Sequence, residues 1–283
     1  MSLEYINFNG EIIQSQTPVL TVSNRGFRYG DGLFESMRYM KGELKFPELH
    51  LDRLRKGMRM LKLEGYSQID SYFLKEKTEE LIRKNKIGTD AKVRLIIYRN
   101  GDGLYSPITN KIGYVLQAVK SDLLRYGEGR GLIIDVFNEH TKPVNSLSNL
   151  KTCNSMLFVL AGIFKNQHRL DEVIILNQSG FLCEALTSNV FVVYNKQIYT
   201  PALSEGCIGG VMRQVVMRII KENDLPLIEA QISPEILNEA EEIFLTNASF
   251  GIRWVMGYNR KRYFNEVSKF LIEQLNNFDK GDF

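Results

Sequence analysis

Two charged residues in the second half of the chain have surroundings in which a side chain could react. Lys151 lies in the polar segment SLSNLKTCN, residues 146–154, after an expected strand and before an expected helix. A lysine in such a place can project into a cleft and form a Schiff base with a carbonyl compound. Glu184 stands between an apolar FLC run and a strand, and a buried carboxylate there requires a cation or a strong donor. Taken alone, each residue is more simply explained as an ordinary surface group.

Four further segments have residue types that suit anions or the wall of a pocket. In RYGDGLFES, residues 28–36, two glycines flank an aspartate, and glycine lets a ligand approach the backbone closely. HLDRL, residues 50–54, places Arg53 beside the apolar face of a predicted helix, where its rigid fork can meet a phosphate. GCIGGVMR, residues 206–213, puts glycines before a helix start, and LTNASFG, residues 245–251, offers small polar side chains. Helix N-termini attract phosphates, but each segment alone is a weak signal.

Hydrophobic periodicity predicts the elements that must position these residues. Leu51 and Leu54 belong to an apolar stripe with helical spacing, which predicts a helix over residues 47–62. Similar spacing predicts helices over 152–166 and 210–223. The runs KVRLIIYR and IGYVLQAV are rich in β-branched residues and predict strands.

The order of these elements predicts an α+β protein with two domains. Residues 121–131, SDLLRYGEGRG, interrupt the pattern with charges and glycines, as a linker does. We therefore expect a small N-terminal domain over residues 1–120 and a larger C-terminal domain over residues 132–283.

Composition excludes several classes of partner. The chain has 283 residues and a net charge of +3 without a dense basic run, so we expect no nucleic-acid partner. It has three cysteines without a C-x-x-C pair, which is typical of reduced thiols in a cytoplasmic protein. Its three histidines form no cluster with zinc-ligand spacing, so we expect no metal. The N-terminus has no signal-peptide pattern, and no apolar run is long enough for a membrane span.

Taken together and in order, these segments resemble the class IV aminotransferases, which depend on pyridoxal 5′-phosphate (PLP) and have PLP fold type IV. The resemblance covers nearly the whole chain, and it includes the E-x-x-x-S-N-x-F pattern formed by Glu184, Ser188, Asn189 and Phe191. The family contains branched-chain and D-amino-acid aminotransferases and 4-amino-4-deoxychorismate lyases. It implies a D-amino-acid aminotransferase-like fold with a small N-terminal α/β domain and a larger β-barrel-like domain with helices. It also implies an active site between the domains and a homodimer.

The resemblance assigns roles to individual residues. Lys151 would hold PLP as a Schiff base and carry the proton, and Glu184 would pair with the pyridine nitrogen. Arg53 and the backbone N–H groups of Val211 and Met212 would bind the phosphate. The resemblance places further residues around the cofactor: Ser188, Asn189, Asn247, Ala248 and Ser249. It places another group around the substrate: Tyr29, Phe34, Glu35, Arg99 and Tyr105.

Three positions depart from the family's usual residues. Ala248 stands where a hydroxyl residue often binds the phosphate, and Ser155 stands where many members have a tyrosine. Leu104 replaces an arginine with which some lyases bind a substrate carboxylate, and Arg99 is an alternative cation nearby.

These features favour an aminotransferase that exchanges an amino group between a branched-chain or similar amino acid and a 2-oxo acid. The main alternative is a 4-amino-4-deoxychorismate lyase, which releases 4-aminobenzoate and pyruvate with the same cofactor residues. The segments KT-x-N and LTNAS favour the lyase, whereas Leu104 favours the aminotransferase. A third alternative, a catalytically inactive relative, is disfavoured because Lys151, Glu184 and Arg53 are all retained.

Overall fold

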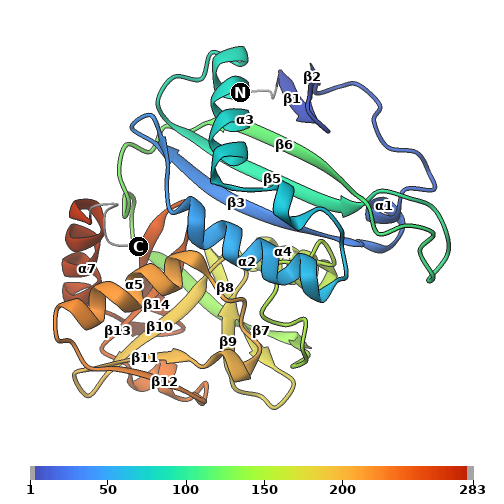
Figure 1. Cartoon of the computed structure of the whole chain (residues 1–283). Coiled ribbons are helices and arrows are strands. Elements are labelled where there is room, and N and C mark those ends of the chain that lie inside the picture. The colour runs from blue at the N-terminus through green and yellow to red at the C-terminus, as the bar shows by residue number, and fades with distance from the viewer. Residues whose placement is uncertain (1–3, 279–283) are drawn as a thin grey trace. The chain divides into compact units, whose positions relative to one another are not determined.

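The structure is a computed structural model that describes residues 4–278 (Figure 1). Their contacts divide the chain into two compact units. Among the described residues, unit 1 contains 4–124 together with 150–155, and unit 2 contains 125–149 together with 156–278. The change of unit at residue 124 falls inside the segment that we expected to be a linker. The short segment that carries Lys151 belongs to unit 1 although both of its flanks belong to unit 2, which the order of elements did not indicate.

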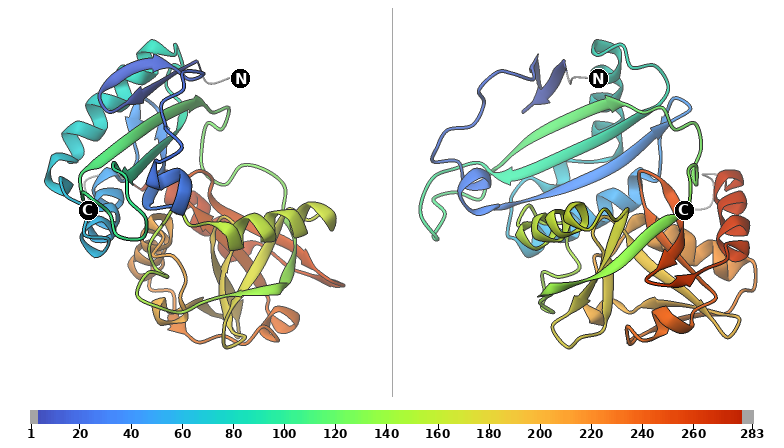
Figure 2. Two further views of the ribbon diagram at one scale, coloured as in Figure 1. Left: turned by 90° about the vertical axis from the view of Figure 1, so that its right-hand side faces the viewer. Right: turned by 180° about the vertical axis from the view of Figure 1, so that it is seen from behind.

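Unit 1 is built on an antiparallel sheet of six strands. From one edge to the other these are β2 (Glu11–Gln14), β1 (Tyr5–Phe8), β6 (Ile112–Lys120), β5 (Ala91–Arg99), β3 (Gly32–Met40) and β4 (Glu43–Leu44). The helices α2 (Pro47–Met60) and α3 (Ser71–Lys84) cover one face of this sheet (Figure 2). A short helix α1 (Arg25–Tyr29) precedes β3, and a 3₁₀ turn η1 (Tyr66–Gln68) lies between α2 and α3.

The alternation of side chains along β3 decides which residues of this strand meet the helices. Leu33 and Met37 lie in the buried cluster that also contains Leu51 and Leu54 of α2. Successive side chains of a strand point to opposite faces, so Phe34 points away from α2. Helix α2 begins with proline at its first turn, where the missing N–H costs no hydrogen bond. The structure confirms the helix predicted over 47–62, which begins at Pro47 and ends at Met60.

Unit 2 contains a mixed sheet of nine strands. Eight follow one another in the order β12 (Leu227–Ala230), β11 (Gln197–Pro201), β10 (Asn189–Tyr194), β13 (Glu242–Asn247), β14 (Gly251–Tyr258), β7 (Leu132–Lys142), β8 (Glu172–Asn177) and β9 (Leu182–Ala185), while β15 (Lys261–Arg262) pairs with β14. The sheet curls, so that β9 at one end also contacts β10 and β11. A buried apolar cluster that includes Val190, Val192, Ile243 and Leu245 forms its core.

Four helices and one 3₁₀ turn complete unit 2. They are α4 (Met156–Gln167), η2 (Leu203–Glu205), α5 (Val211–Glu222), α6 (Ile236–Glu239) and α7 (Glu266–Asn277). Helix α4 begins at Met156 rather than at residue 152, because the preceding residues bridge to β3 of unit 1 in extended form. No helix within residues 4–278 combines the length and apolar character that crossing a bilayer requires.

Candidate active site

Lys151 is fixed through its backbone to the edge of β3. The N–H of Phe34 donates to the carbonyl of Lys151 at 2.9 Å, and the N–H of Cys153 donates to the carbonyl of Gly32 at 2.9 Å. Leu33 and Thr152 form the β-bridge between these two bonds. The backbone of the lysine is therefore held by strand-like pairing, and its side chain starts from a defined position.

Two cations lie against the ring of Phe34. The amine of Lys151 is 4.5 Å from the ring centroid, and the guanidinium carbon of Arg94 is 4.0 Å from it. Both distances fall within the range of cation–π contacts. Arg94 forms no ion pair with a carboxylate among residues 4–278. Burial lowers the pKa of Arg94, and the nearby thiol of Cys153 raises it by a smaller amount. The presence of two cations beside one ring makes this part of unit 1 suited to an anionic ligand.

Glu35 points to the opposite face of β3, where it meets two side chains of α2. Arg53 donates to both of its carboxylate oxygens, from Nε at 2.8 Å and from Nη2 at 2.5 Å. His50 Nδ1 lies 2.6 Å from Oε2, and Glu35 and His50 are almost fully buried. Burial raises the pKa of Glu35, but the charges and hydrogen bonds of Arg53 and His50 outweigh burial and lower it to about 2. The carboxylate is therefore an anion at neutral pH.

Arg99, one of the residues predicted to line the substrate pocket, contacts the partly buried carboxylate of Asp31. Asp31 Oδ2 accepts from Arg25 Nε at 2.7 Å and from Arg99 Nε at 2.9 Å. Arg99 also donates to Asn110 Oδ1 and to a backbone carbonyl, so its donors are engaged within the fold. Tyr29 and Tyr105 contact each other, with ring centroids 5.6 Å apart. The structure therefore brings Arg99 together with Asp31, and Tyr29 together with Tyr105, whose side chain is 90% exposed.

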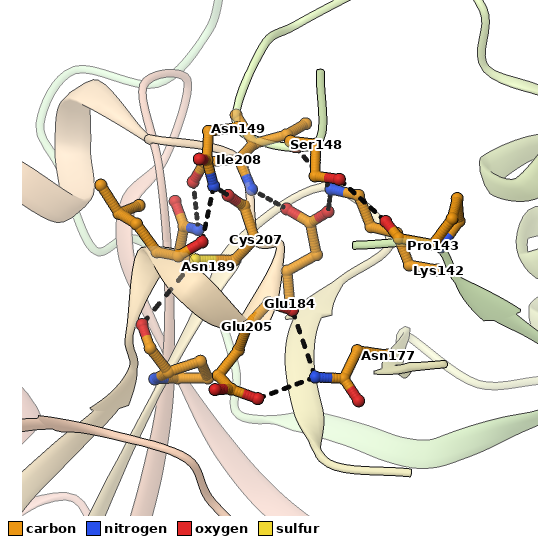
Figure 3. Close-up of polar contacts among 12 residues, drawn as sticks. Lys142, Pro143, Ser148, Asn149, Asn177, Glu184, Asn189, Glu205, Cys207 and Ile208 are labelled. Carbon is orange, nitrogen blue, oxygen red and sulfur yellow. Dashed lines mark hydrogen bonds and ion pairs between the residues drawn. The ribbon is translucent and has the colours of Figure 1, made fainter. Parts of the chain in front are cut away.

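In unit 2, Glu184 is a buried carboxylate with a buried cation beside it (Figure 3). Its Oε1 accepts a hydrogen bond from Lys142 Nζ, and its Oε2 accepts from the N–H of Ile208 at 3.0 Å. Lys142 Nζ also donates to the carbonyl of Ser148 at 3.1 Å and lies 5.5 Å from the ring centroid of Phe158. A buried charge without a partner is costly, so Lys142 and Glu184 stabilise each other.

The loop before α5 is held from two sides (Figure 3). Asn189 Nδ2 donates to the carbonyl of Ile208 at 2.8 Å, and Asn149 Nδ2 donates to the carbonyl of Cys207 at 2.7 Å. Gly210 precedes the helix, and a Cβ there would lie 2.0 Å from Asn189 Oδ1. Gly210 is the N-cap of α5 and supplies no side-chain cap, so the N–H groups of the first turn, including those of Val211 and Met212, can bind an anion.

The remaining predicted cofactor residues form a polar turn at the end of β13. Asn247 Nδ2 donates to Ser188 Oγ at 3.0 Å. Its Oδ1 accepts from the N–H groups of Ser249 at 3.0 Å and of Phe250 at 2.9 Å. Ala248 lies within this turn and is partly exposed. The pairing of Asn189 in β10 with Thr246 in β13 places the turn beside the loop before α5.

Comparisons with known proteins identify the family of the chain. The family described as Amino-transferase class IV matches residues 32–257. The chain belongs to this family. A putative branched-chain-amino-acid aminotransferase from Methanocaldococcus jannaschii is 29% identical over 258 residues, which cover 86% of this chain and 84% of the relative.

Solved structures show that the fold is PLP fold type IV, as the sequence predicted. A branched-chain aminotransferase from Thermoproteus uzoniensis with norvaline has a TM-score of 0.86 and 21% identity, covering 97% of this chain and 94% of the other. A putative 4-amino-4-deoxychorismate lyase from Legionella pneumophila has a TM-score of 0.79 and 21% identity, with coverage of 93% and 96%. An aminotransferase from Brucella abortus bound to PLP has a TM-score of 0.84 and 19% identity, with coverage of 97% and 99%.

Three residues of these clusters received no role from the sequence. Arg94 is one of the polar residues that alternate with buried apolar residues along β5. Lys142 is the last residue of β7 and precedes a proline. For His50 the sequence indicated only that it shares a helix face with Arg53. Among the described residues no group of three or more histidines, cysteines and carboxylates could hold a metal ion.

Proposed function

We propose that this chain is a PLP-dependent aminotransferase that moves an amino group between a branched-chain or similar amino acid and a 2-oxo acid. The observation that carries the proposal is the position of the Lys151 amine, which lies with Arg94 against the ring of Phe34 in a family member. The near-complete coverage of a branched-chain aminotransferase relative supports this substrate class. When bound, PLP supplies an electron sink for the bonds of the substrate Cα.

The residues of each unit fit this cofactor. The backbone of Lys151 is fixed, which confines its amine to one region, where it would bond an aldehyde. Glu184 accepts hydrogen bonds from Lys142 and Ile208, whereas an ionised carboxylate has about four acceptor sites. It therefore retains capacity for a protonated ring nitrogen. The start of α5 has N–H groups without a side-chain cap, which suits a phosphate.

Each of these groups would then have a separate task. Lys151 would bond the cofactor and would move the proton at the substrate Cα, and Glu184 would hold the proton on the ring nitrogen. Arg53 and the first N–H groups of α5 would bind the phosphate. Arg94 would bind a carboxylate of the substrate, because its planar guanidinium can donate to two carboxylate oxygens and it forms no ion pair with a carboxylate among residues 4–278.

The direct test is the visible spectrum of the purified protein with PLP, followed by addition of single amino acids. We expect an absorbance band of lysine-bound cofactor that bleaches with one of the branched-chain amino acids, and keto acid should form in proportion. Lys151→Ala is the control: it should keep the fold but show neither the band nor turnover. A wild-type protein that shows no band with excess PLP would refute the proposal.

The structural likeness to the Legionella lyase supports 4-amino-4-deoxychorismate lyase as a second candidate. Leu104 disfavours it, because this residue is 67% exposed and supplies no charge for a substrate carboxylate. The same spectra separate the two functions. A lyase would release pyruvate and 4-aminobenzoate from 4-amino-4-deoxychorismate while the band persists, and amino acids would not bleach it.

We also propose that the enzyme is a cytoplasmic homodimer. Apolar side chains of unit 1 are exposed along residues 22–27 and 104–108: Val22, Phe27, Leu104, Tyr105 and Ile108. Arg25 joins these two segments by donating to the carbonyls of Gly103 and Leu104. An exposed apolar patch is typical of a protein interface, and a second copy is the partner that the family implies. Sedimentation of the purified chain measures its oligomeric state, and the three free cysteines fit a reducing compartment.

A further inference from the structure

Glu35 is tied to α2 by three contacts that all arise from one turn of that helix. His50 and Arg53 are three positions apart, so they share one helix face, and both reach the carboxylate of Glu35. The side chain of Glu35 is 2% exposed, that of His50 is 1% exposed and that of Arg53 is 11% exposed. The cluster is therefore nearly dry, and its hydrogen bonds are not in competition with water.

The charges of this cluster nearly cancel. Arg53 and the ionised Glu35 form a neutral pair, and burial lowers the pKa of His50 despite the opposing effect of Glu35. A neutral His50 must donate from Nδ1, because the carboxylate oxygen it faces can only accept. The cluster cannot attract an anion by net charge. What it can supply is a guanidinium with a fixed orientation.

The contacts of Glu35 show which edge of Arg53 is fixed. Both bonds use the Nε–Nη2 edge, which is the side-on, two-point geometry that a carboxylate shares with a guanidinium. A guanidinium held at two points by a buried carboxylate keeps one orientation. A ligand that it binds therefore need not immobilise a long side chain, and such preorganisation raises affinity.

We propose that Glu35, held in turn by His50, is a positioning residue that orients the guanidinium of Arg53 for the phosphate of PLP. The inference rests on the proposed function and deepens it. It also replaces the substrate-pocket role that the resemblance suggested for Glu35, because Glu35 and Phe34 point to opposite faces of β3. The substrate-side cations Arg94 and Lys151 lie with Phe34.

A comparison of two ligands that differ only in the phosphate tests this role. Affinities for PLP and for pyridoxal, which has no phosphate, are measured from the absorbance band in wild type, Glu35→Gln, Arg53→Ala and the double variant. We expect Glu35→Gln to weaken PLP binding roughly tenfold or more, as for loss of one partner of a buried charged pair. Pyridoxal binding should be unchanged. The double variant should lose no more PLP affinity than Arg53→Ala alone.

Asp31→Asn is the matched control, since Asp31 is also a carboxylate held by arginines in unit 1. Asp31→Asn should change the affinities for PLP and for pyridoxal to the same extent. His50 supplies a second pair of variants in case Glu35→Gln does not fold. His50→Phe, which removes the donor, should weaken PLP selectively, while His50→Asn, which retains a donor near the Nδ1 position, should restore much of the affinity.

The outcomes separate this inference from the proposed function. If wild type forms the band with PLP but Glu35→Gln weakens both ligands equally, or weakens neither, Glu35 does not act through the phosphate and the inference is wrong while the function stands. The same holds if the losses of Glu35→Gln and Arg53→Ala add in the double variant. A wild type that forms no band with either ligand overturns the proposed function, and the inference with it.

Discussion

Glu35 in unit 1 and Glu184 in unit 2 are both buried carboxylates beside a buried or nearly buried cation, but they are satisfied differently. Glu35 receives three hydrogen bonds from two side chains of one helix. Glu184 receives two, one from Lys142 and one from the backbone of Ile208. The first carboxylate is therefore nearly saturated by its own unit, whereas the second keeps acceptor capacity.

We propose that this difference separates a group that supports a binding residue from a group that meets the ligand itself. A saturated carboxylate has little left to offer a ligand, so the effect proposed for Glu35 passes through Arg53. A carboxylate with spare acceptor sites can take a proton-bearing ring nitrogen directly. The two clusters would be confused by a search for buried acidic residues alone, and only their partners distinguish them.

Removing the cation from each cluster should give the largest effect. Lys142→Met leaves Glu184 with one backbone donor, and loss of one partner of a buried pair typically costs about 3–5 kcal/mol of unfolding free energy. Arg53→Met should cost less, because His50 still donates to Glu35. Chemical denaturation of the cofactor-free variants measures both losses of unfolding free energy. The double variant Lys142→Met/Glu184→Gln should recover most of the loss, and equal losses for the two cation variants would contradict the comparison.

The carboxylate of unit 2 should control turnover more than affinity. Glu184→Gln keeps the shape but cannot stabilise a protonated ring nitrogen, so we expect kcat to fall by about 10²–10³-fold, the range for loss of one preorganised electrostatic contact. Lysine-bound cofactor should still form. Single-turnover kinetics separates this result from the affinity effect expected of Glu35→Gln. If Glu184→Gln altered only PLP affinity, the two carboxylates would have the same kind of role.

The carboxylate of unit 1 should make the fold sensitive to acid. The folded-state pKa of Glu35 is about 2 against an ordinary 4.5, so its stabilising contribution is complete above pH 4.5 and is lost as pH falls toward 2. The charged groups around it are Arg53 and His50, and Lys151 acts on His50. Between pH 5 and pH 2, wild type should lose about 3 kcal/mol more unfolding free energy than Glu35→Gln. Parallel pH profiles of the two cofactor-free proteins would contradict this.

His50 should add a second acid-sensitive step at higher pH. Its folded-state pKa is lowered from 6.5 by burial, so the unfolded chain binds its proton more readily than the folded chain. Stability is therefore lost as pH falls below 6.5. Replacing His50 with asparagine should flatten this part of the wild-type profile and leave the lower step due to Glu35.

The sequence predicted the parts of the fold that depend on local pattern. The helix that carries His50 and Arg53 and the strand that carries Arg94 follow from periodicity, and family motifs identified Lys151 and Glu184. It did not predict that Glu35 turns toward α2, because this depends on which face of β3 packs against the helix. Nor did it predict the pairing of Lys142 with Glu184, since those residues lie on different strands and meet only when the sheet forms.

The smallest effect concerns the polar turn at the end of β13. Ala248 stands where the family resemblance implies a hydroxyl residue, and Asn247 already fixes the turn through two backbone donors. Ala248→Thr would add a donor for the phosphate without rebuilding the loop. One hydrogen bond contributes roughly 1 kcal/mol, or about fivefold in affinity. PLP titration should show this gain, pyridoxal titration should not, and Ala248→Val controls for the added bulk.

Equal affinities for the threonine and valine variants would have a specific meaning. The turn would then contribute nothing to phosphate binding through a side-chain hydroxyl, so the selectivity for PLP over pyridoxal would depend on Arg53 and the start of α5. In that case the loss expected for Glu35→Gln should be larger, because fewer donors remain to compensate for a misoriented guanidinium. Combining Ala248→Thr with Glu35→Gln decides this point. A partial rescue of PLP affinity would show that the added hydroxyl and the positioned arginine contribute to binding the same phosphate.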